Sequence, residues 1–184
     1  MVGASIIESV KQGEKGAFKL MYQDCIAYVF SIVRRYVVND SDHPDVIQEI
    51  FARVFLSIGT FDTSKGDFKF WLRRVVINQC MQHHRKGKSA ASLVSIHKVS
   101  EDNLQADDQI EQFSKADIEQ LLNQMPEGYR QIFMLIIIDE YSHQEAGALL
   151  GISPETSRSQ LSRAKSWLRK NLYNNELKTL ANGL

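Results

Sequence analysis

Polar and cationic side chains crowd one short stretch near the C-terminal end, and their types suit contact with DNA. Arg158, Arg163 and Lys165 are cations, and residues 156–175 contain no acidic residue. Cations bind phosphate groups, arginine can pair bidentately with guanine, and glutamine can pair with adenine. The stretch predicts a surface that recognises duplex DNA, with these candidates: Glu155, Thr156, Arg158, Ser159, Gln160, Arg163 and Lys165.

Two helices joined by a tight turn are predicted to position these side chains. Ser142 and Glu145 form a capping-box pattern, in which each side chain accepts a hydrogen bond from the other residue's amide. Gly151 permits the left-handed residue that ends the first helix, and Ser153 with Pro154 suits the start of the second. This pattern is typical of a helix-turn-helix that docks in the major groove. The alternative is an ordinary helical hairpin with a solvated basic face, which the agreement of caps, glycine and basic helix disfavours.

The charge of the whole chain is balanced, but its distribution is uneven. The 184 residues include 22 basic and 22 acidic side chains, so the formal net charge is zero. Residues 65–88 are strongly cationic, whereas residues 100–111 are acidic and contain no cation. Local patches matter more than the sum for binding a polyanion, so the neutral total does not exclude a nucleic-acid partner.

Cysteine and apolar patterns indicate the compartment. Cys25 and Cys80 fall within apolar helical patterns, which predicts reduced thiols in a hydrophobic core rather than a disulfide. The N-terminal segment has no basic stretch followed by an apolar run, so we expect no secretion signal. The strongest apolar run, residues 132–138, is too short to span a bilayer. A cytoplasmic location is therefore expected.

Apolar residues recur at helical spacing through most of the chain, and no segment alternates with a period of two. Helices are predicted near residues 5–12, 18–36, 44–58 and 68–76, with Ser64 as the N-cap of the last. The buried stripe of the long second helix is predicted to be Phe18, Tyr22, Cys25, Val29, Ile32 and Tyr36.

The predicted fold class is all-α, with two small helical domains joined by a flexible linker. Residues 87–112 are polar and partly acidic and carry no sustained apolar stripe, which is typical of a linker. Helical patterns return near residues 118–125 and 126–138, ahead of the helix-turn-helix. We therefore expect domains over residues 1–88 and 113–184, with the linker over residues 89–112.

Four segments, in this order, resemble sigma factors of bacterial RNA polymerase. Residues 45–51 resemble the acidic helix that docks on the polymerase clamp, and residues 61–78 resemble the segment that opens the promoter. Residues 122–133 and 141–165 resemble the domain called sigma4. The helical linker domain of larger sigma factors is missing, so the likeness is strongest to the small extracytoplasmic-function (ECF) group, which has only sigma2 and sigma4. Ser157 is a departure, since many members have valine or isoleucine facing the core at this position.

The resemblance implies that Asp45, Gln48 and Glu49 contact core RNA polymerase. Asp45 and Glu49 are four residues apart, so their carboxylates share a helix face and would steer association with a basic surface. On spacing alone, acids that complement the dipole of a helix N-terminus are an equal alternative, and the resemblance favours docking. The apolar run at residues 133–138 is predicted to form the core of its domain, with docking on the polymerase flap as the alternative.

The resemblance also implies that residues 61–78 open promoter DNA and that the loop of residues 60–67 captures an extruded base, and the residue types of the whole segment 61–86 suit this role. Unstacking a base costs roughly a few kcal/mol, which a pocket and aromatic stacking must offset. Phe70 adds aromatic surface to the segment, whereas Trp71 fits a plain core role equally well, and a solvated face is the alternative for the cations. The candidate contacts with single-stranded DNA are Phe61, Lys65, Phe68, Lys69, Trp71, Arg73, Arg74, Asn78, Gln82, Arg85 and Lys86.

The function implied is transcription initiation, in which the N-terminal domain opens the downstream promoter element and the C-terminal domain reads the upstream element. The implied partners are core RNA polymerase, promoter DNA in duplex and single-stranded form, and an anti-sigma factor that could hold the chain at the inner membrane. No cofactor, metal or small-molecule substrate is expected.

Two other functions compete with this interpretation. A stand-alone helix-turn-helix repressor or activator would bind a specific duplex site without polymerase. A metal site would need more than Cys80, His83 and His84, which lack a fourth ligand at metal spacing. No nucleophile–base pair or phosphate-binding glycine loop stands out in the sequence, so an enzyme is not expected.

Overall fold

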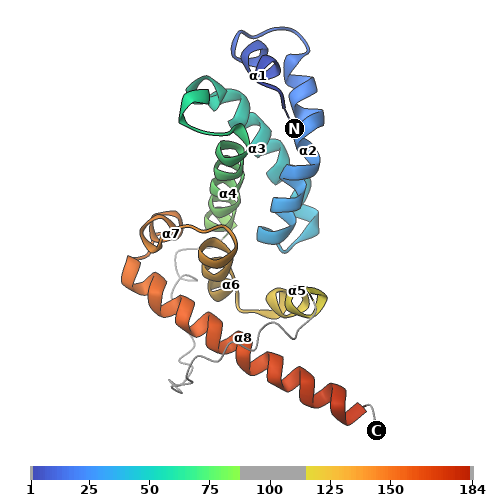
Figure 1. The fold of residues 1–184 in the computed structure, drawn as a ribbon, viewed down its shortest axis with the longest axis vertical. Helices are drawn as coiled ribbons and strands as arrows, with labels where there is room; N and C mark the ends of the chain where they lie inside the picture. Colours follow the sequence, from blue (N-terminus) through green and yellow to red (C-terminus); the bar gives the residue numbers. More distant parts are fainter. Residues whose placement is uncertain (1, 88–114, 183–184) are drawn as a thin grey trace. The chain divides into compact units, whose positions relative to one another are not determined.

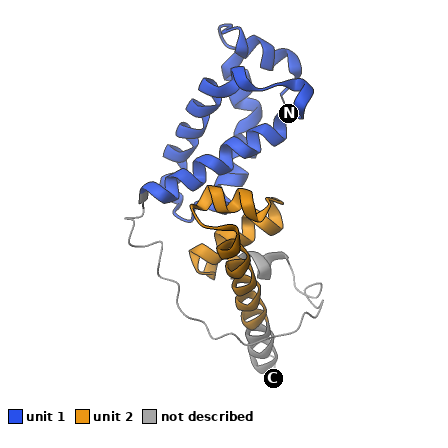
Figure 2. Cartoon of the chain, turned by 90° about the vertical axis from the view of Figure 1, so that its left-hand side faces the viewer, with its two compact units in different colours: residues 1–94 blue, residues 95–184 orange. Residues whose placement is uncertain are grey.

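The structure, a computed structural model, describes residues 2–87 and 115–182, and every regular element in these ranges is a helix (Figure 1). The chain divides into two compact units, unit 1 over residues 1–94 and unit 2 over residues 95–184 (Figure 2). The predicted all-α class with two helical domains is therefore confirmed. The predicted linker, residues 89–112, lies outside the described residues, so the exact domain boundaries stay a prediction. None of the helices in the described ranges is long and apolar enough to cross a membrane.

Unit 1 is a bundle in which three longer helices pack on one another and a short first helix packs on the second. Its helices are α1 Ala4–Lys11, α2 Ala17–Tyr36, α3 His43–Ser57 and α4 Phe68–Gly87, with 3₁₀ turns at Asp40–Asp42, Ile58–Thr60 and Thr63–Lys65. Removal of large apolar side chains from water is the main source of stability in such a bundle. Examples of fully buried side chains from α2, α3 and α4 are Met21, Val29, Ile32, Ile50, Leu72, Ile77 and Met81.

The start of α4 differs from the prediction. Asp67 precedes this helix, and its Oδ1 accepts a hydrogen bond of 2.7 Å from the amide of Lys69. The prediction that Ser64 caps the helix is wrong, because Ser64 lies in the preceding 3₁₀ turn and bonds to Asp62. Gly66, with a φ of 151°, turns the chain between the two, in a conformation that residues with a side chain rarely adopt.

Unit 2 packs three shorter helices against one long helix. Its elements are α5 Lys115–Gln124, α6 Glu127–Phe133, a π-helical turn Met134–Ile138, α7 His143–Leu150 and α8 Pro154–Asn182. Buried side chains from these elements form one small core: Leu121, Ile132, Leu135, Ala146, Ala164 and Leu168. The core lies under the helix-turn-helix, which α7 and α8 form.

The predicted helix of residues 126–138 widens near its end. The amide of Asp139 donates to the carbonyl of Met134 at 2.9 Å, which is the five-residue spacing of a π turn rather than the four-residue spacing of an α-helix. Ile137 and Ile138 at the end of this turn are 41% and 40% exposed. The prediction that the whole run of residues 133–138 is core is therefore wrong for its last two residues.

Cys25 and Cys80 are buried free thiols, as predicted. Burial raises the pKa of Cys25 to about 11 and that of Cys80 to about 12, because an apolar environment disfavours the thiolate. The thiolate is the reactive form of cysteine, so both side chains act as small apolar groups in the core.

Candidate functional site

The turn that leads into α8 is built as the sequence predicts. The amide of Glu145 donates to Ser142 Oγ at 3.2 Å, and the Glu145 carboxylate accepts from the Ser142 amide at 3.0 Å. Gly151 ends α7 with a φ of 71°, the expected left-handed conformation. Ser153 Oγ accepts from the amide of Thr156 at 3.1 Å, so α8 begins with a capped N-terminus.

A close backbone approach across this turn depends on Gly147, which the sequence analysis missed. A Cβ atom at Gly147 would lie 2.7 Å from the carbonyl oxygen of Ile152, nearer than real Cβ atoms come. The amide of Ile152 in turn donates to the carbonyl of Gly147 at 3.0 Å. A glycine inside an otherwise helical pattern was the available signal, because it usually has a packing reason.

The seven residues between 155 and 165 that were predicted to contact duplex DNA form the recognition face of α8. The polar contacts that the structure shows for this face lie within α8 and its N-cap. Arg158 lies 3.4 Å from the Glu155 carboxylate, and Ser159 Oγ donates to the Thr156 carbonyl. The pKa of Glu155 lies below its ordinary value because its own amide and then the Ser153 hydroxyl bond its carboxylate. Exposed pairs of this kind are weak, so DNA can displace them. Glu155, Arg158, Ser159 and Lys165 are exposed, and Thr156, Gln160 and Arg163 are half-buried.

Three aromatic residues that were predicted to contact single-stranded DNA form one cluster at the loop that precedes α4. The ring centroids of Phe61, Phe68 and Trp71 lie 5.4, 5.5 and 5.6 Å apart. Phe61 and Phe68 are only 6% and 5% exposed, whereas Trp71 is half-buried. Two of the rings therefore belong to the core of the loop, and Trp71 remains partly exposed. Phe70 is the most exposed aromatic residue of the segment, at 66%.

Most of the predicted cationic and amide contacts of unit 1 face solvent. The Lys69 ammonium lies 5.5 Å from the centroid of the Tyr28 ring, a cation–π contact, and Lys65 pairs with Asp62 at 3.5 Å. The hydroxyl and then the amide of Ser64 lower the pKa of Asp62, which keeps this loop carboxylate charged. Lys65, Lys69, Arg74, Gln82, Arg85 and Lys86 are exposed, and Arg73 and Asn78 are half-buried.

Glu49, one of the three predicted polymerase contacts, bridges α3 and α4. Gln79 Nε2 donates to Glu49 Oε2 at 2.6 Å, and Lys86 Nζ lies 3.2 and 3.4 Å from the two carboxylate oxygens. The hydrogen bond from Lys86 and then that from Gln79 hold the pKa of Glu49 below 4.5. A predicted polymerase contact and a predicted DNA contact thus bind each other. Gln79 is buried and was missed, although a glutamine among the apolar residues of α4 is a recognisable signal.

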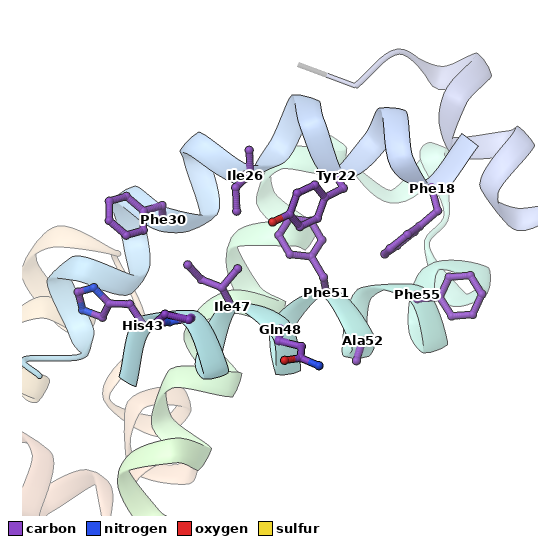
Figure 3. Close-up of a pocket in the computed structure, with 11 residues that line it drawn as sticks. Phe18, Tyr22, Ile26, Phe30, His43, Ile47, Gln48, Phe51, Ala52 and Phe55 are labelled. Atoms are coloured by element: carbon purple, nitrogen blue, oxygen red, sulfur yellow. The ribbon is translucent and has the colours of Figure 1, made fainter. Parts of the chain in front are cut away.

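An apolar groove between α2 and α3 is a second feature that the sequence analysis missed. The rings of Tyr22 and Phe51 meet in it at a centroid distance of 4.4 Å. Tyr22, Phe30 and Phe55 nevertheless remain 39%, 41% and 54% exposed. Figure 3 shows side chains that line the groove along the two helices: Phe18, Tyr22, Ile26 and Phe30 of α2, and His43, Ile47, Gln48, Phe51, Ala52 and Phe55 of α3. Pro44 of α3 also lines the groove.

The groove corrects one prediction and had a visible signal. Tyr22 was predicted in the buried stripe of α2, but it is exposed, and Phe18 is half-buried. The apolar residues of α2 at positions 18, 22, 26 and 30 form a second stripe beside the buried one. A helix with two apolar stripes has more apolar surface than its own bundle covers, and such surface marks an interaction site. Gln48 lines this groove, and Asp45 is exposed on the same helix.

His83 and His84 have separate structural contacts, whereas Cys80 is a buried free thiol. His83 Nε2 lies 3.4 Å from Asp42 Oδ2, and His84 Nε2 lies 2.6 Å from the carbonyl oxygen of Tyr36. These contacts tie the end of α4 to the end of α2 and the turn that follows it. In the part of the chain that the structure describes, no group of three or more potential ligand residues is arranged to hold a metal ion.

Two protein-family models match the chain, one in each unit. Residues 21–90 match Sigma-70 region 2, and residues 115–168 match Sigma-70, region 4. Together the two matches span more than half of the chain. The first contains the groove except Phe18, the aromatic loop and α4, and the second contains the turn and the recognition face of α8.

Individual relatives agree with these matches. The chain is 27% identical over 177 residues to the ECF RNA polymerase sigma factor SigW of Bacillus subtilis, covering 90% of this chain and 94% of that protein. It is 24% identical over 173 residues to the ECF RNA polymerase sigma-E factor of Escherichia coli, covering 87% and 88%. Its fold is similar to that of the sigma factor RpoE from Bartonella quintana, solved in complex with the anti-sigma factor NepR, with a TM-score of 0.52, 19% identity, and coverage of 86% and 98%.

These matches decide between the functions that the sequence left open. A stand-alone regulator needs only a helix-turn-helix, whereas this chain has both sigma regions and spans most of the length of its relatives. A sigma factor that directs RNA polymerase is favoured, and the stand-alone repressor or activator is not. Sigma factors are not enzymes, so family membership supports the expectation that this chain catalyses no reaction. The chain belongs to the sigma-70 family and, within it, to the ECF group of RNA polymerase sigma factors.

Proposed function

We propose that unit 1 binds core RNA polymerase and separates the strands of the downstream promoter element, while unit 2 reads the upstream element as duplex DNA. The observation that carries this proposal is the solvent-exposed polar and cationic face of α8 on a capped helix-turn-helix. Such a helix face fits the major groove. Unit 1 has the residue types that bind single-stranded DNA, namely cations beside an aromatic loop.

Core polymerase is proposed to bind along α3. Asp45 and Gln48 are exposed on this helix, and Gln48 lines the apolar groove. A groove with exposed aromatic side chains beside an acidic residue suits a partner helix that has an apolar ridge and a basic flank. Glu49 can contribute a direct contact only by sharing its carboxylate with Gln79 and Lys86 or by exchanging them.

Strand separation is assigned to the loop of residues 60–67 and the adjacent part of α4. Phe61 and Phe68 pack together in the loop, and we assign the stacking of an unstacked base to the exposed part of the Trp71 side chain. Such stacking contributes about 1–3 kcal/mol per base, which is close to the cost of unstacking one. Opening several base pairs therefore requires further contributions, which we assign to phosphate contacts by Lys65 and Lys69 and to the bound polymerase.

An anti-sigma factor is proposed as a second partner. The aromatic groove of unit 1 is a surface that proteins normally keep covered. The relative from Bartonella quintana was solved with the anti-sigma factor NepR, which supports a similar inhibitor for this chain. Such an inhibitor would hold the chain inactive in the cytoplasm, or at the inner membrane where the inhibitor itself is anchored.

The test combines the purified chain, core RNA polymerase and a promoter that the reconstituted complex selects from a randomised library. Permanganate reactivity of thymines then reports strand opening. Opening that requires both proteins supports the proposal. Failure to select any promoter overturns it, and so does tight duplex binding by the chain alone with no opening when polymerase is added.

A matched pair of variants tests the surface assigned to the single strand. Lys69 and Lys19 are both exposed cations of unit 1, but Lys19 lies on α2, outside the proposed surface. We expect the double variant Lys69→Ala/Trp71→Ala to slow opening by about 10-fold or more, since one stacking contact is worth about 1–3 kcal/mol. Lys19→Ala should open at the normal rate. Circular dichroism checks that each variant is folded, and equal rates of opening would remove this segment from the mechanism.

A further inference from the structure

A buried hydrogen bond joins the two helices of the helix-turn-helix. Ser157 lies on the inner side of α8 and is 0% exposed. Its Oγ lies 2.8 Å from Nδ1 of His143, which is the first residue of α7 and 14 positions earlier in the chain. Ser157 is also the departure from the family pattern noted above, and a valine or isoleucine at this position could not form the bond.

The hydroxyl of Ser157 needs this partner. An unpaired hydroxyl is costly inside a protein, and Leu161 and Ala164 on the same buried face of α8 have no polar side-chain atoms. A neutral histidine ring accepts at one nitrogen and donates at the other, so Nδ1 of His143 can bond to the Ser157 hydroxyl in either tautomer, as acceptor or as donor. Unlike apolar packing, a hydrogen bond is directional, so it restricts the rotation of α8 about its own axis.

The bond fixes α7 to α8 at a second point. The first point is the turn, where Gly147 and Ile152 are in close backbone contact and exchange a hydrogen bond of 3.0 Å. The second point lies at the opposite end of α7, where His143 reaches Ser157. Because α7 is held at its first residue and, through Gly147, at the turn that follows it, the angle and the rotation of α8 relative to α7 are set together.

A rotation of α8 would move its recognition face. Arg158 and Ser159 directly follow Ser157 and are exposed, so the orientation of the buried hydroxyl fixes theirs. A helix with its side chains has a radius of about 5–6 Å, so a rotation of about 20° displaces the side-chain ends by about 2 Å. Bidentate contacts with base edges tolerate a displacement of roughly a few tenths of an ångström.

We propose that Ser157 and His143 form a positioning pair that sets the base preference of α8 without contacting DNA. The inference rests on the proposed role of α8 as the reader of the upstream promoter element. Loss of the bond changes or broadens the base preference of the holoenzyme. It leaves general attraction to DNA intact, because the cations on the recognition face remain.

The experiment uses holoenzyme reconstituted from the full chain and core polymerase, with a promoter library randomised in the upstream element. Sequencing of the transcripts gives the base preference at each position. Ser157→Ala is expected to weaken the preference at one or more positions by about fivefold, the usual effect of one hydrogen bond, and Ser157→Thr, which keeps the hydroxyl, to restore it. His143→Ala should change the same positions, and the double variant should add nothing further, because both changes remove the same bond.

Ser166→Ala is the matched control on the same helix. It removes a hydroxyl whose hydrogen bond, to the carbonyl of Ser162 at 3.1 Å, stays within α8, so base preference should not change. Thermal unfolding separates positioning from stability. If Ser157→Ala lowers the Tm but leaves every base preference as in the unaltered chain, the positioning role is overturned.

Two further outcomes are distinguishable. If Ser157→Ala does not fold, His143→Ala at its half-buried position takes its place, with the same supporting and overturning results. If the unaltered chain yields no transcript from any member of the library, the proposed function itself fails, and that result does not depend on the variants.

Discussion

The two units use their chemically important residues in opposite ways. In unit 2, the recognition face of α8 makes its recorded polar contacts within its own helix and cap, and other residues form the core beneath it. In unit 1, Phe61 and Phe68 are candidates for base capture and are also the core of their loop. Glu49, a candidate for polymerase docking, also joins α3 to α4. Function and stability are thus separable at the recognition face of unit 2 and coupled in unit 1.

The difference follows from what each unit has to recognise. Base edges in a duplex are reached by side chains that project from a complete helix, so the protein core need not take part. An unstacked base exposes its flat faces, and these need an aromatic surface shielded from water. A small domain obtains such a surface most directly from the edge of its own core. A substitution that removes an aromatic contact with single-stranded DNA in unit 1 should therefore also destabilise the unit.

The largest effect is expected from Phe68→Ala in unit 1. This ring is 5% exposed and contacts Phe61 and Trp71, so its loss should lower the free energy of unfolding of unit 1 by about 3–5 kcal/mol. Trp71 in unit 1 and Trp167 in unit 2 are the two tryptophans of the chain. In variants that keep only one tryptophan, its fluorescence during urea unfolding follows one unit at a time. Phe68→Ala should shift only the unfolding transition of unit 1 to lower urea concentration. An equal shift of the transition followed by Trp167 would mean that the two units do not unfold independently.

The next effect is expected from Gly147→Ala in unit 2. The added Cβ would lie 2.7 Å from the carbonyl oxygen of Ile152, so the turn must shift, at a cost of about 1–3 kcal/mol. The fluorescence of Trp167 during urea unfolding measures this loss. Gly128→Ala in α6 is the control, because a Cβ there meets no atom within 4 Å. Equal stability of the two variants would show that the turn tolerates a side chain, and would remove one of the two points that hold α7 to α8.

The features of unit 2 that the sequence predicted depend on residues close together in the chain. The capping box of Ser142 and Glu145 and the left-handed Gly151 involve residues only a few positions apart, so local chemistry determines them. The buried face of α8 follows from helical spacing alone. The π turn at residues 134–138 was not predictable in this way, because apolar spacing cannot distinguish four-residue from five-residue hydrogen bonding.

The features of unit 1 that the sequence did not predict depend on how separate helices meet. The bond between Gln79 and Glu49 joins residues 30 positions apart, and the groove needs both α2 and α3. The helical spacing of a side chain such as Tyr22 predicts that it is buried in the core. The spacing does not distinguish a side chain covered by its own domain from one that a partner covers. Where function uses the packing of a bundle, the sequence pattern identifies the helices but not the shared surface between them.

A smaller effect, confined to function, is expected from Arg158→Ala on the recognition face. If Arg158 pairs with a base, its loss should reduce discrimination at one promoter position by about 10-fold, the low end of the range for a bidentate contact. The free energy of unfolding should change by no more than about 0.5 kcal/mol, because the side chain is exposed. The promoter library and urea unfolding supply the two measurements. Lys170→Ala, an exposed cation beyond the recognition face, is the control for charge. Uniform weakening across all sequences would make Arg158 a phosphate contact.

The smallest effect is expected from Glu49→Gln. The pH dependence of its stability tests most directly whether the Glu49 carboxylate joins α3 to α4. Bonds from Lys86 and Gln79 hold the pKa of Glu49 below its ordinary value of 4.5, so the folded state favours the carboxylate. The stabilisation is therefore present above pH 4.5 and is lost as the pH falls through the lowered pKa. Because the pair is partly exposed, Glu49→Gln should cost about 0.2–1 kcal/mol at pH 7, and the difference from the unaltered chain should shrink in urea unfolding below pH 4.5. Glu14→Gln, at an exposed position between α1 and α2, is the control for the loss of a carboxylate. A difference between Glu49→Gln and the unaltered chain that stays constant with pH would mean that the carboxylate does not hold α3 to α4, and would leave Glu49 available to polymerase alone.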